Sequence, residues 1–152
     1  MTEINFYVSK EEGLNNRLMI VNRLIGIAVQ RKLSIHVHTS NVQECKTVDD
    51  FLWNHQKTSF IPHRVIFSKN IDNNTDTNVE KNQLSEVSIG HDFEPMVNCD
   101  YLINLSSKRP EFFSRYLKFA EIIDTSEEIL TAGRKRYAFY RDRGYTLEYH
   151  QL

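Results

Sequence analysis

The chain has 152 residues, 40% of them hydrophobic, and this length supports a single domain, residues 1–152, with one core rather than two domains. Its 19 Lys and Arg residues nearly cancel its 20 Asp and Glu residues, so the molecule as a whole has no field that would hold it on a polyanion such as DNA. A basic binding site must therefore be local, and nucleic acid is expected to be contacted only indirectly.

The first half of the chain alternates between strand and helix patterns. Residues 3–8 are rich in strand formers, and residues 14–31 carry an apolar stripe at helical spacing. Residues 33–38 then alternate apolar and polar side chains with the period of two that is typical of a strand. Asn41 and Glu44 stand at the spacing of a capping box, which predicts the start of a second helix. The apolar stripe of that helix is formed by Val42, Cys45, Val48 and Leu52.

The second half begins with a different composition. Residues 69–83 are polar and Asn-rich, and they offer too little apolar surface to offset the entropy of ordering them, which predicts a mobile surface loop. Pro110 marks the expected start of a further helix. The last helix is expected between Ser126 as its N-cap and Gly144 as its C-terminal stop. Short strands are predicted at 64–67, 86–89, 100–106 and 119–124.

The alternation of strands with helices predicts a mostly parallel sheet with helices on both faces, a three-layer α/β/α arrangement. Such sheets often bind nucleotides through a glycine-rich phosphate loop, but the chain has only five glycines. None of them falls in a G-x-G-x-x-G or G-x-x-x-x-G-K pattern, and Gly13 stands alone after the first strand. The sequence therefore predicts a Rossmann-like scaffold without a nucleotide-binding loop and without a cofactor.

His36 and His38 are the residues that most favour an enzyme. At a spacing of two on a strand they project from one face, as two metal ligands can, and His63, His91 and Asp92 could complete a metal-dependent hydrolase site. The alternative is that both histidines only occupy the wetter face of the strand, because the chain has no H-x-x-x-H or H-E-x-x-H pattern. We expect no metal and no catalytic residue. A stoichiometric zinc or manganese in the purified protein would overturn this expectation.

Cysteine usage and hydropathy bear on the compartment. Cys45 and Cys99 lack the C-x-x-C spacing, and no secretory signal stands before the first predicted strand, so reduced thiols in the cytoplasm are expected. No apolar run approaches the roughly 20 residues that a bilayer span requires, and no membrane partner is expected.

A local excess of positive charge stands near the C-terminus, in residues 133–145. On a helix, Arg134, Tyr137 and Arg141 share one face. One interpretation is a solvated basic helix end that complements the helix dipole. The other is a socket for an acidic peptide or a terminal carboxylate, with aromatic rings below and guanidinium groups above. The basic residues of the segment are Arg134, Lys135, Arg136, Arg141 and Arg143, against the single acid Asp142.

A second unusual stretch, VDDFLWNHQKTSFIPH at 48–63, holds the only Trp of the chain. A segment this rich in aromatic and polar groups either lines a site or fixes a corner. We interpret Trp53 as a candidate partner contact, because exposed aromatic residues beside basic groups favour interfaces. Phe60, Pro62 and His63 are interpreted as the corner that presents it.

Taken in order along the chain, these stretches resemble the chi subunit family of bacterial DNA polymerase III. One hallmark of that family is an acidic and apolar helix end that runs into Leu-Trp and then Ser-Phe-x-Pro-His, present here as Asp49, Asp50, Leu52, Trp53, Ser59, Phe60, Pro62 and His63. A second is an Arg-x-Arg-Tyr-x-x-Tyr-Arg-x-x-Gly helix, present as Arg134, Arg136, Tyr137, Tyr140, Arg141 and Gly144. The resemblance spans nearly the whole chain except the Asn-rich segment.

The resemblance implies a non-catalytic adaptor with a parallel five-stranded sheet of order 3-2-1-4-5. It implies binding to the psi subunit, which ties chi to the clamp loader, and to the acidic C-terminal tail of the single-stranded-DNA-binding protein. Some members of the family suggest a helicase as an additional partner. The implied tail-binding residues are Trp53, Arg134 and Tyr137. Ala138 departs from the family, which often has a basic residue there, so the tail is expected either to bind more weakly or to rely more on Arg141 or Lys135.

Overall fold

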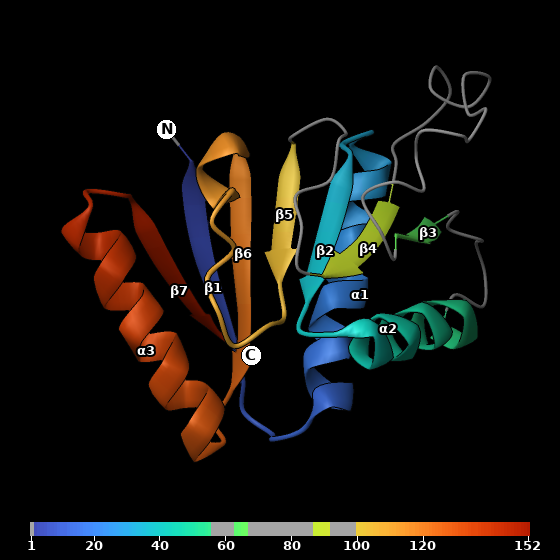
Figure 1. Cartoon of the computed structure of the whole chain (residues 1–152), viewed down its shortest axis with the longest axis horizontal. Helices are drawn as coiled ribbons and strands as arrows, with labels where there is room; N and C mark the ends of the chain where they lie inside the picture. The colour runs from blue at the N-terminus through green and yellow to red at the C-terminus, as the bar shows by residue number, and fades with distance from the viewer. Residues whose placement is uncertain (1, 56–62, 67–86, 92–99) are drawn as a thin grey trace.

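The computed structural model describes residues 2–55, 63–66, 87–91 and 100–152 (Figure 1). At 53, 55 and 63–66 the backbone alone is described. The Asn-rich segment 69–83, predicted to be a loop, lies outside these residues, and so do Ser59, Phe60 and Pro62 of the predicted corner.

The described residues form three α-helices and seven strands. The strands are β1 (Glu3–Ser9), β2 (Ile35–Thr39), β3 (His63–Ile66), β4 (Val87–His91), β5 (Tyr101–Asn104), β6 (Lys118–Asp124) and β7 (Leu147–Gln151). The helices are α1 (Leu14–Gln30), α2 (Val42–His55) and α3 (Glu127–Asp142), with one 3-10 turn, η2 (Phe113–Arg115). All of these strands except β7, and all three helices, match elements predicted from the sequence.

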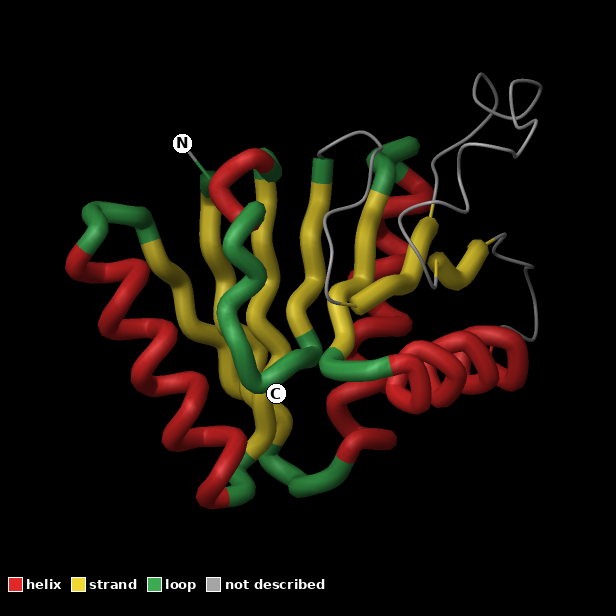
Figure 2. The backbone as a smooth tube through the Cα atoms, viewed as in Figure 1, coloured by secondary structure: helices red, strands yellow, loops and turns green. Residues whose placement is uncertain are grey.

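The seven strands form one sheet (Figure 2), and every pair of neighbours in it is parallel. Their order is β3-β4-β2-β5-β6-β1-β7. The predicted α/β fold with a parallel sheet is confirmed, but the expected five strands in the order 3-2-1-4-5 are not what forms. β1 does not lie beside β2, because β6 pairs with β1 over seven residues, from Glu3 opposite Lys118 to Ser9 opposite Asp124.

β7 is the strand that the sequence analysis missed. It lies at the edge of the sheet and pairs with β1, from Ile4 opposite Leu147 to Val8 opposite Gln151. Glu148 is exposed on this strand, and so is its neighbour Tyr149 on the opposite side, so the residues show no apolar alternation. Sheet edges commonly carry such polar strands, which discourage further pairing.

Helices α1 and α2 cover one face of the sheet, and α3 covers the other (Figure 1). α1 packs on β1 and β6, while α2 packs on β2, β3 and β4. The core between these two helices and the sheet is mostly aliphatic, and Cys45 is buried in it as a free thiol. None of the helices in the described part of the chain has the length and apolar character needed to cross a membrane. Fully buried members of this core include Val21, Ile25, Val37, Val48, Ile89 and Ile103.

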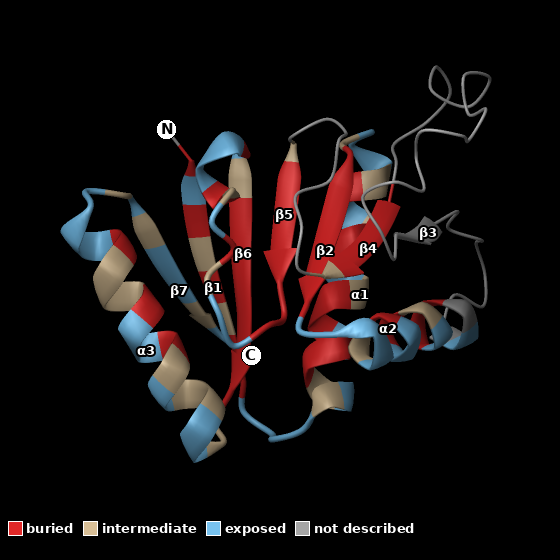
Figure 3. Cartoon of the chain, in the orientation of Figure 1, coloured by how far each residue is buried: buried red, intermediate tan, exposed pale blue. Residues whose placement is uncertain are grey.

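The core between α3 and the sheet is aromatic, and the strands that face it are mostly buried (Figure 3). Phe6 of β1, Phe119 of β6 and Tyr140 of α3 are almost fully buried in it. Phe113 joins them from η2, with its ring centroid 5.4 Å from that of Phe119 and 5.0 Å from that of Tyr140. The helix expected from Pro110 is reduced to this single turn, because the segment has to place Phe113 and then Tyr116 into the same core.

The ends of the helices follow local chemistry. The predicted capping box at α2 is confirmed: the Glu44 N–H donates to Asn41 Oδ1 over 2.8 Å, and Glu44 Oε1 accepts from the Ser40 N–H over 2.9 Å. Val42 was expected in the buried stripe of α2 but is 38% exposed. Gly144 follows α3 with a positive φ of 88°, a conformation that favours glycine at a helix end.

Candidate partner-binding site

Helix α3 presents its basic residues to solvent because other positions anchor it. Gly133 and Tyr140 are buried against the sheet, with Gly133 close to the side chain of Ile123. Arg134 and Lys135, which follow Gly133, consequently point away from the core and are exposed. Neither makes an ion pair with any described residue. The helix therefore carries two cationic groups that are available to a partner.

Tyr137 lies between the exposed basic face and the aromatic core. Its side chain is half-buried, and its ring meets that of Phe6 edge-on, with 5.2 Å between the centroids. This contact already restricts the rotamer of Tyr137. Little side-chain entropy would therefore be lost when a partner binds against the ring. Ala138 is also half-buried, so the methyl group stands where a longer basic side chain would reach out.

Arg141 completes the predicted face one turn after Tyr137. Its Nε lies 3.5 Å from Asp142 Oδ1, and the two side chains are 64% and 71% exposed. An ion pair this exposed is screened by water and contributes little to stability, so it does not hold Arg141 away from another carboxylate. The predicted socket residues Arg134, Lys135, Tyr137 and Arg141 thus lie together on one helix.

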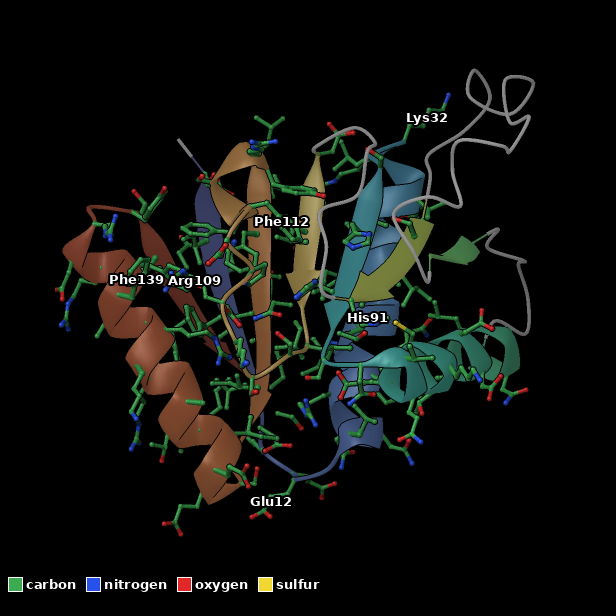
Figure 4. The ribbon with its side chains drawn as sticks, viewed as in Figure 1. Glu12, Lys32, His91, Arg109, Phe112 and Phe139 are labelled. Carbon is green, nitrogen blue, oxygen red and sulfur yellow. The ribbon has the colours of Figure 1, made fainter. Side chains whose placement is uncertain are left out.

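A stack of two arginines on one ring extends the basic surface, and the sequence analysis did not anticipate it. Arg109 lies beside Phe139 (Figure 4), with its guanidinium carbon 3.7 Å from the ring centroid. The guanidinium carbon of Arg143 lies 4.5 Å from the same centroid. Such cation–π contacts contribute about 0.5–1 kcal/mol at exposed sites. Arg109 comes from the loop after β5, and no local spacing in the sequence links it to α3.

Trp53 lies elsewhere in the molecule. It stands near the C-terminal end of α2, which packs on β2, β3 and β4, whereas α3 packs on β6 and β7. The two helices cover opposite faces of the sheet. The structure therefore brings four of the five predicted partner-binding residues together and places the backbone of Trp53 apart from them.

A buried polar cluster fixes the inner side of α3. Arg136 Nε donates to Glu121 Oε2 over 3.0 Å, and the Asn104 amide donates to the other carboxylate oxygen over 2.9 Å. The Tyr140 hydroxyl also donates to Glu121. Burial raises the pKa of Glu121, against the opposing effect of the Arg136 charge and the three hydrogen bonds. Because these partners hold Glu121, Arg136 belongs to the scaffold of α3 and not to its exposed basic face.

The histidine pair on β2 is part of the interior. His36 and His38 are 1% and 8% exposed, and His36 Nδ1 lies 2.7 Å from Ser88 Oγ on the neighbouring strand. Both histidines were predicted to lie on the more solvent-exposed face of the strand, but they are buried in the structure. In the described ranges of the chain, no three His, Cys, Asp or Glu side chains are grouped as a metal site would require. Of the other ligands considered, Asp92 and the side chain of His63 lie outside those ranges.

The comparison with known families gives the decisive observation. The model of the DNA polymerase III chi subunit family matches residues 1–148. This chain belongs to the DNA polymerase III chi subunit family. The predicted resemblance is confirmed, and the coarse function follows from it: a chi subunit of DNA polymerase III that serves DNA replication.

Two individual proteins show how far the similarity reaches. The DNA polymerase III subunit chi of Pseudomonas aeruginosa is 28% identical over 152 residues, which cover the whole of this chain and 98% of the relative. The crystal structure of T4 UvsW superposes with a TM-score of 0.63 at 12% identity, over 99% of this chain and 41% of that one. The second similarity concerns the fold alone. The fold of this chain therefore also occurs as part of a larger protein.

Proposed function

We propose that this chi-family protein is a non-catalytic adaptor of the DNA polymerase III holoenzyme. In this proposal it binds the psi subunit, and through psi the clamp loader, and it also binds the acidic C-terminal tail of the single-stranded-DNA-binding protein. The observation that carries the proposal is the outer face of α3, where exposed Arg134 and Lys135 have no ion pair with a described residue and Arg134 stands one turn before the fixed ring of Tyr137.

The chemistry of this face suits an acidic peptide that ends in a free carboxylate. A guanidinium group offers two parallel N–H donors that match the two oxygens of a carboxylate, and the pairing is stronger than a neutral hydrogen bond. An apolar side chain of the peptide would lie against the half-buried ring of Tyr137. Lys135 and Arg141 would add attraction for further acidic residues of the tail. Ala138 contributes no charge.

Trp53 enters the proposal as a separate contact. Its helix covers the opposite face of the sheet from α3, so a ring at that position cannot form the floor beneath Arg134. We assign it to the partner surface of the α2 side, where an aromatic side chain contributes contact area and not charge. Loss of Trp53 should then leave the salt dependence of tail binding unchanged.

Isothermal titration calorimetry with a short acidic tail peptide, at two salt concentrations, tests the assignment of the tail to α3. Arg134→Ala removes a charge-assisted hydrogen bond worth about 1.5–3 kcal/mol, so affinity should fall by roughly ten-fold or more. Its salt dependence should also flatten, because salt screens only the charged contribution. Ala138→Lys should tighten binding by restoring a positive charge.

Arg23→Ala is the matched control, because Arg23 is an exposed arginine of α1, on the opposite face of the sheet. It should leave the affinity for the peptide within error of the wild type. Equal affinities for the wild type and Arg134→Ala would mean that α3 has only a solvated basic end. Co-purification with the psi subunit, which should survive Arg134→Ala, tests the second half of the proposal independently.

A further inference from the structure

A pocket of about 110 Å³ opens at the carboxyl ends of the parallel strands, between the N-terminal parts of α1 and α2 and the inner side of α3. Its walls include Arg17 and Arg136, which are both buried, and the serines at 40, 106 and 107. A space of this size holds several non-hydrogen atoms. The carboxyl edge of a parallel sheet, where chain segments diverge to opposite faces, is also the usual position of ligands in such folds.

Arg17 is the unusual residue of this pocket. Its side chain is 10% exposed, and its Nε lies 3.2 Å from Asp124 Oδ2 without the geometry of a hydrogen bond. Its two terminal nitrogens make no hydrogen bond with any described residue, and of the guanidinium nitrogens only Nε is buried without a partner, so the terminal nitrogens are open to solvent. Asp124 therefore balances the charge of Arg17 and leaves its donors unused. An anionic acceptor that enters from solvent would make charge-assisted hydrogen bonds with the terminal nitrogens, which are stronger than their hydrogen bonds to water.

Asp124 is itself held in place by other donors. The Gly13 N–H and the Ser126 N–H donate to its two oxygens over 3.0 and 2.9 Å. Burial alone would raise the pKa of Asp124, but these hydrogen bonds, that of the Ser126 hydroxyl and the charge of Arg17 together lower it. The carboxylate is thus ionised near neutral pH and fixes one edge of the Arg17 guanidinium group. Arg17 also lines the pocket.

The remaining walls combine apolar residues, such as Leu105, Ile122 and Ile129, with a few polar ones. The hydroxyls of Ser40 and Ser107 make no hydrogen bond with the described part of the chain. Arg136 is already occupied, because its Nε donates to Glu121 and its Nη1 donates to the Ser107 carbonyl over 2.7 Å. Glu44 is the acidic residue on the wall, and one of its oxygens is engaged by the Ser40 N–H.

We propose that this pocket binds a single oxyanion, a phosphate or carboxylate group, through the terminal nitrogens of Arg17 and the hydroxyls of Ser40 and Ser107. The group presents two or three acceptor oxygens to donors that have no acceptor among the described residues, and a guanidinium fork matches two of those oxygens. The site is distinct from the proposed tail site. Arg17 comes from α1 and the pocket faces the inner side of α3, whereas Arg134 lies on the outer side.

Titration of inorganic phosphate into the protein, followed through backbone amide NMR shifts at constant ionic strength, tests the site. Saturable shifts are expected at the amides of Ser40 and Ser107. Arg17→Lys keeps a positive charge beside Asp124 but replaces the fork by a point charge, so phosphate affinity should fall at least ten-fold. Ser107→Ala, at an exposed position, should weaken binding several-fold without affecting folding.

Arg23→Lys is the matched control, because it makes the same substitution at an exposed position of the same helix. It should leave phosphate affinity unchanged. Shifts that do not saturate, or that persist unchanged in both Arg17→Lys and Ser107→Ala, would overturn the proposal and leave only solvent in the pocket.

The acidic tail peptide identifies the source of the oxyanion. If the peptide displaces phosphate and its binding is weakened by Arg17→Lys, the oxyanion is a carboxylate of the partner. If the peptide and phosphate bind together, and Arg134→Ala affects only the peptide, the pocket serves a phosphate group of a small molecule. Failure of phosphate binding with intact peptide binding would refute the pocket while leaving the proposed function standing.

Discussion

The two faces of the sheet are stabilised in different ways. The face beneath α1 and α2 is packed with aliphatic side chains such as Ile25, Val37 and Ile103. The face beneath α3 is packed with aromatic rings around a buried carboxylate, Glu121, which accepts from Arg136 and two further donors. One apolar side chain can often be replaced by another of similar volume, whereas a buried charge needs specific ion-pair and hydrogen-bond partners. The α3 side should therefore tolerate substitution less well than the other face.

The largest effect is expected when the buried ion pair is broken. Arg136→Ala leaves the fully buried Glu121 without its charged partner, which should destabilise the protein by about 3–5 kcal/mol. Denaturant unfolding measures this loss. Arg134→Ala, two residues earlier but exposed, should change stability by less than about 0.5 kcal/mol. Similar losses for both variants would show that the buried pair has no special role.

A cavity on the aliphatic face should reduce the free energy of unfolding somewhat less than loss of the buried ion pair does. Ile25 of α1 is fully buried, and Ile25→Ala should reduce stability by about 2–5 kcal/mol, while Ile25→Val should cost about 0.5–1.5 kcal/mol. The graded pair of variants measures how far this face relaxes around lost volume. Equal losses for Val and Ala would indicate a shape requirement as strict as the one expected around Glu121.

The order of the strands shows what the sequence could and could not predict. Strand and helix positions follow local patterns, and β1, α1, β2 and α2 were predicted within about two residues. The insertion of β6 between β1 and β5 depends on contacts between residues more than 100 positions apart, such as Ile4 with Phe119, and no local pattern encodes them. The edge strand β7 was missed for a related reason, because exposure on both faces removes the alternation.

The candidate site was predictable to a similar extent. The helical spacing of Arg134, Tyr137 and Arg141 placed them on one face, and the structure agrees. The burial of Arg136 was not predicted, because Glu121 lies 15 residues away on a strand. The role of Arg17 was not predicted either, since its ion pair joins α1 to Asp124 at the end of β6, and no local pattern links the two.

A titration effect of intermediate size is expected at the covered face of β2. Burial, followed by the charge of His38, lowers the pKa of His36 to about 3. The unfolded chain, with an ordinary histidine pKa of about 6.5, then binds a proton between these two values that the folded chain does not. Stability from neutral His36 is thus complete above pH 6.5 and declines as pH falls, by at most about 1.4 kcal/mol per pH unit.

His36→Asn tests this effect. Asn cannot titrate but can still bond to Ser88, whose hydroxyl lies 2.7 Å from the histidine ring nitrogen. Unfolding free energies measured from pH 7 to 4 should fall less steeply for the variant than for the wild type. The comparison uses the slope, so a constant loss from the smaller side chain does not affect it. Parallel pH profiles would mean that His36 titrates alike in both states.

The smallest and most local difference between the two faces concerns one glycine on each. Gly26 of α1 has open space where a Cβ would stand, with no heavy atom within 4 Å. Gly26→Ala should therefore stabilise the protein by about 0.5–1 kcal/mol, the usual gain from replacing glycine in a helix. At Gly133 of α3, a Cβ would stand 2.9 Å from Ile123 Cδ1 and 3.2 Å from Cγ2 of the same side chain. The same helix gain is then opposed by overpacking, which costs about 1–3 kcal/mol, so Gly133→Ala should be neutral to destabilising.

Thermal unfolding of the two variants separates these cases, and adding Ile123→Val to Gly133→Ala should recover part of the loss by removing Cδ1. If Gly133→Ala stabilised the protein as much as Gly26→Ala, α3 would be free to move away from β6, and the tight packing inferred for its face would be wrong.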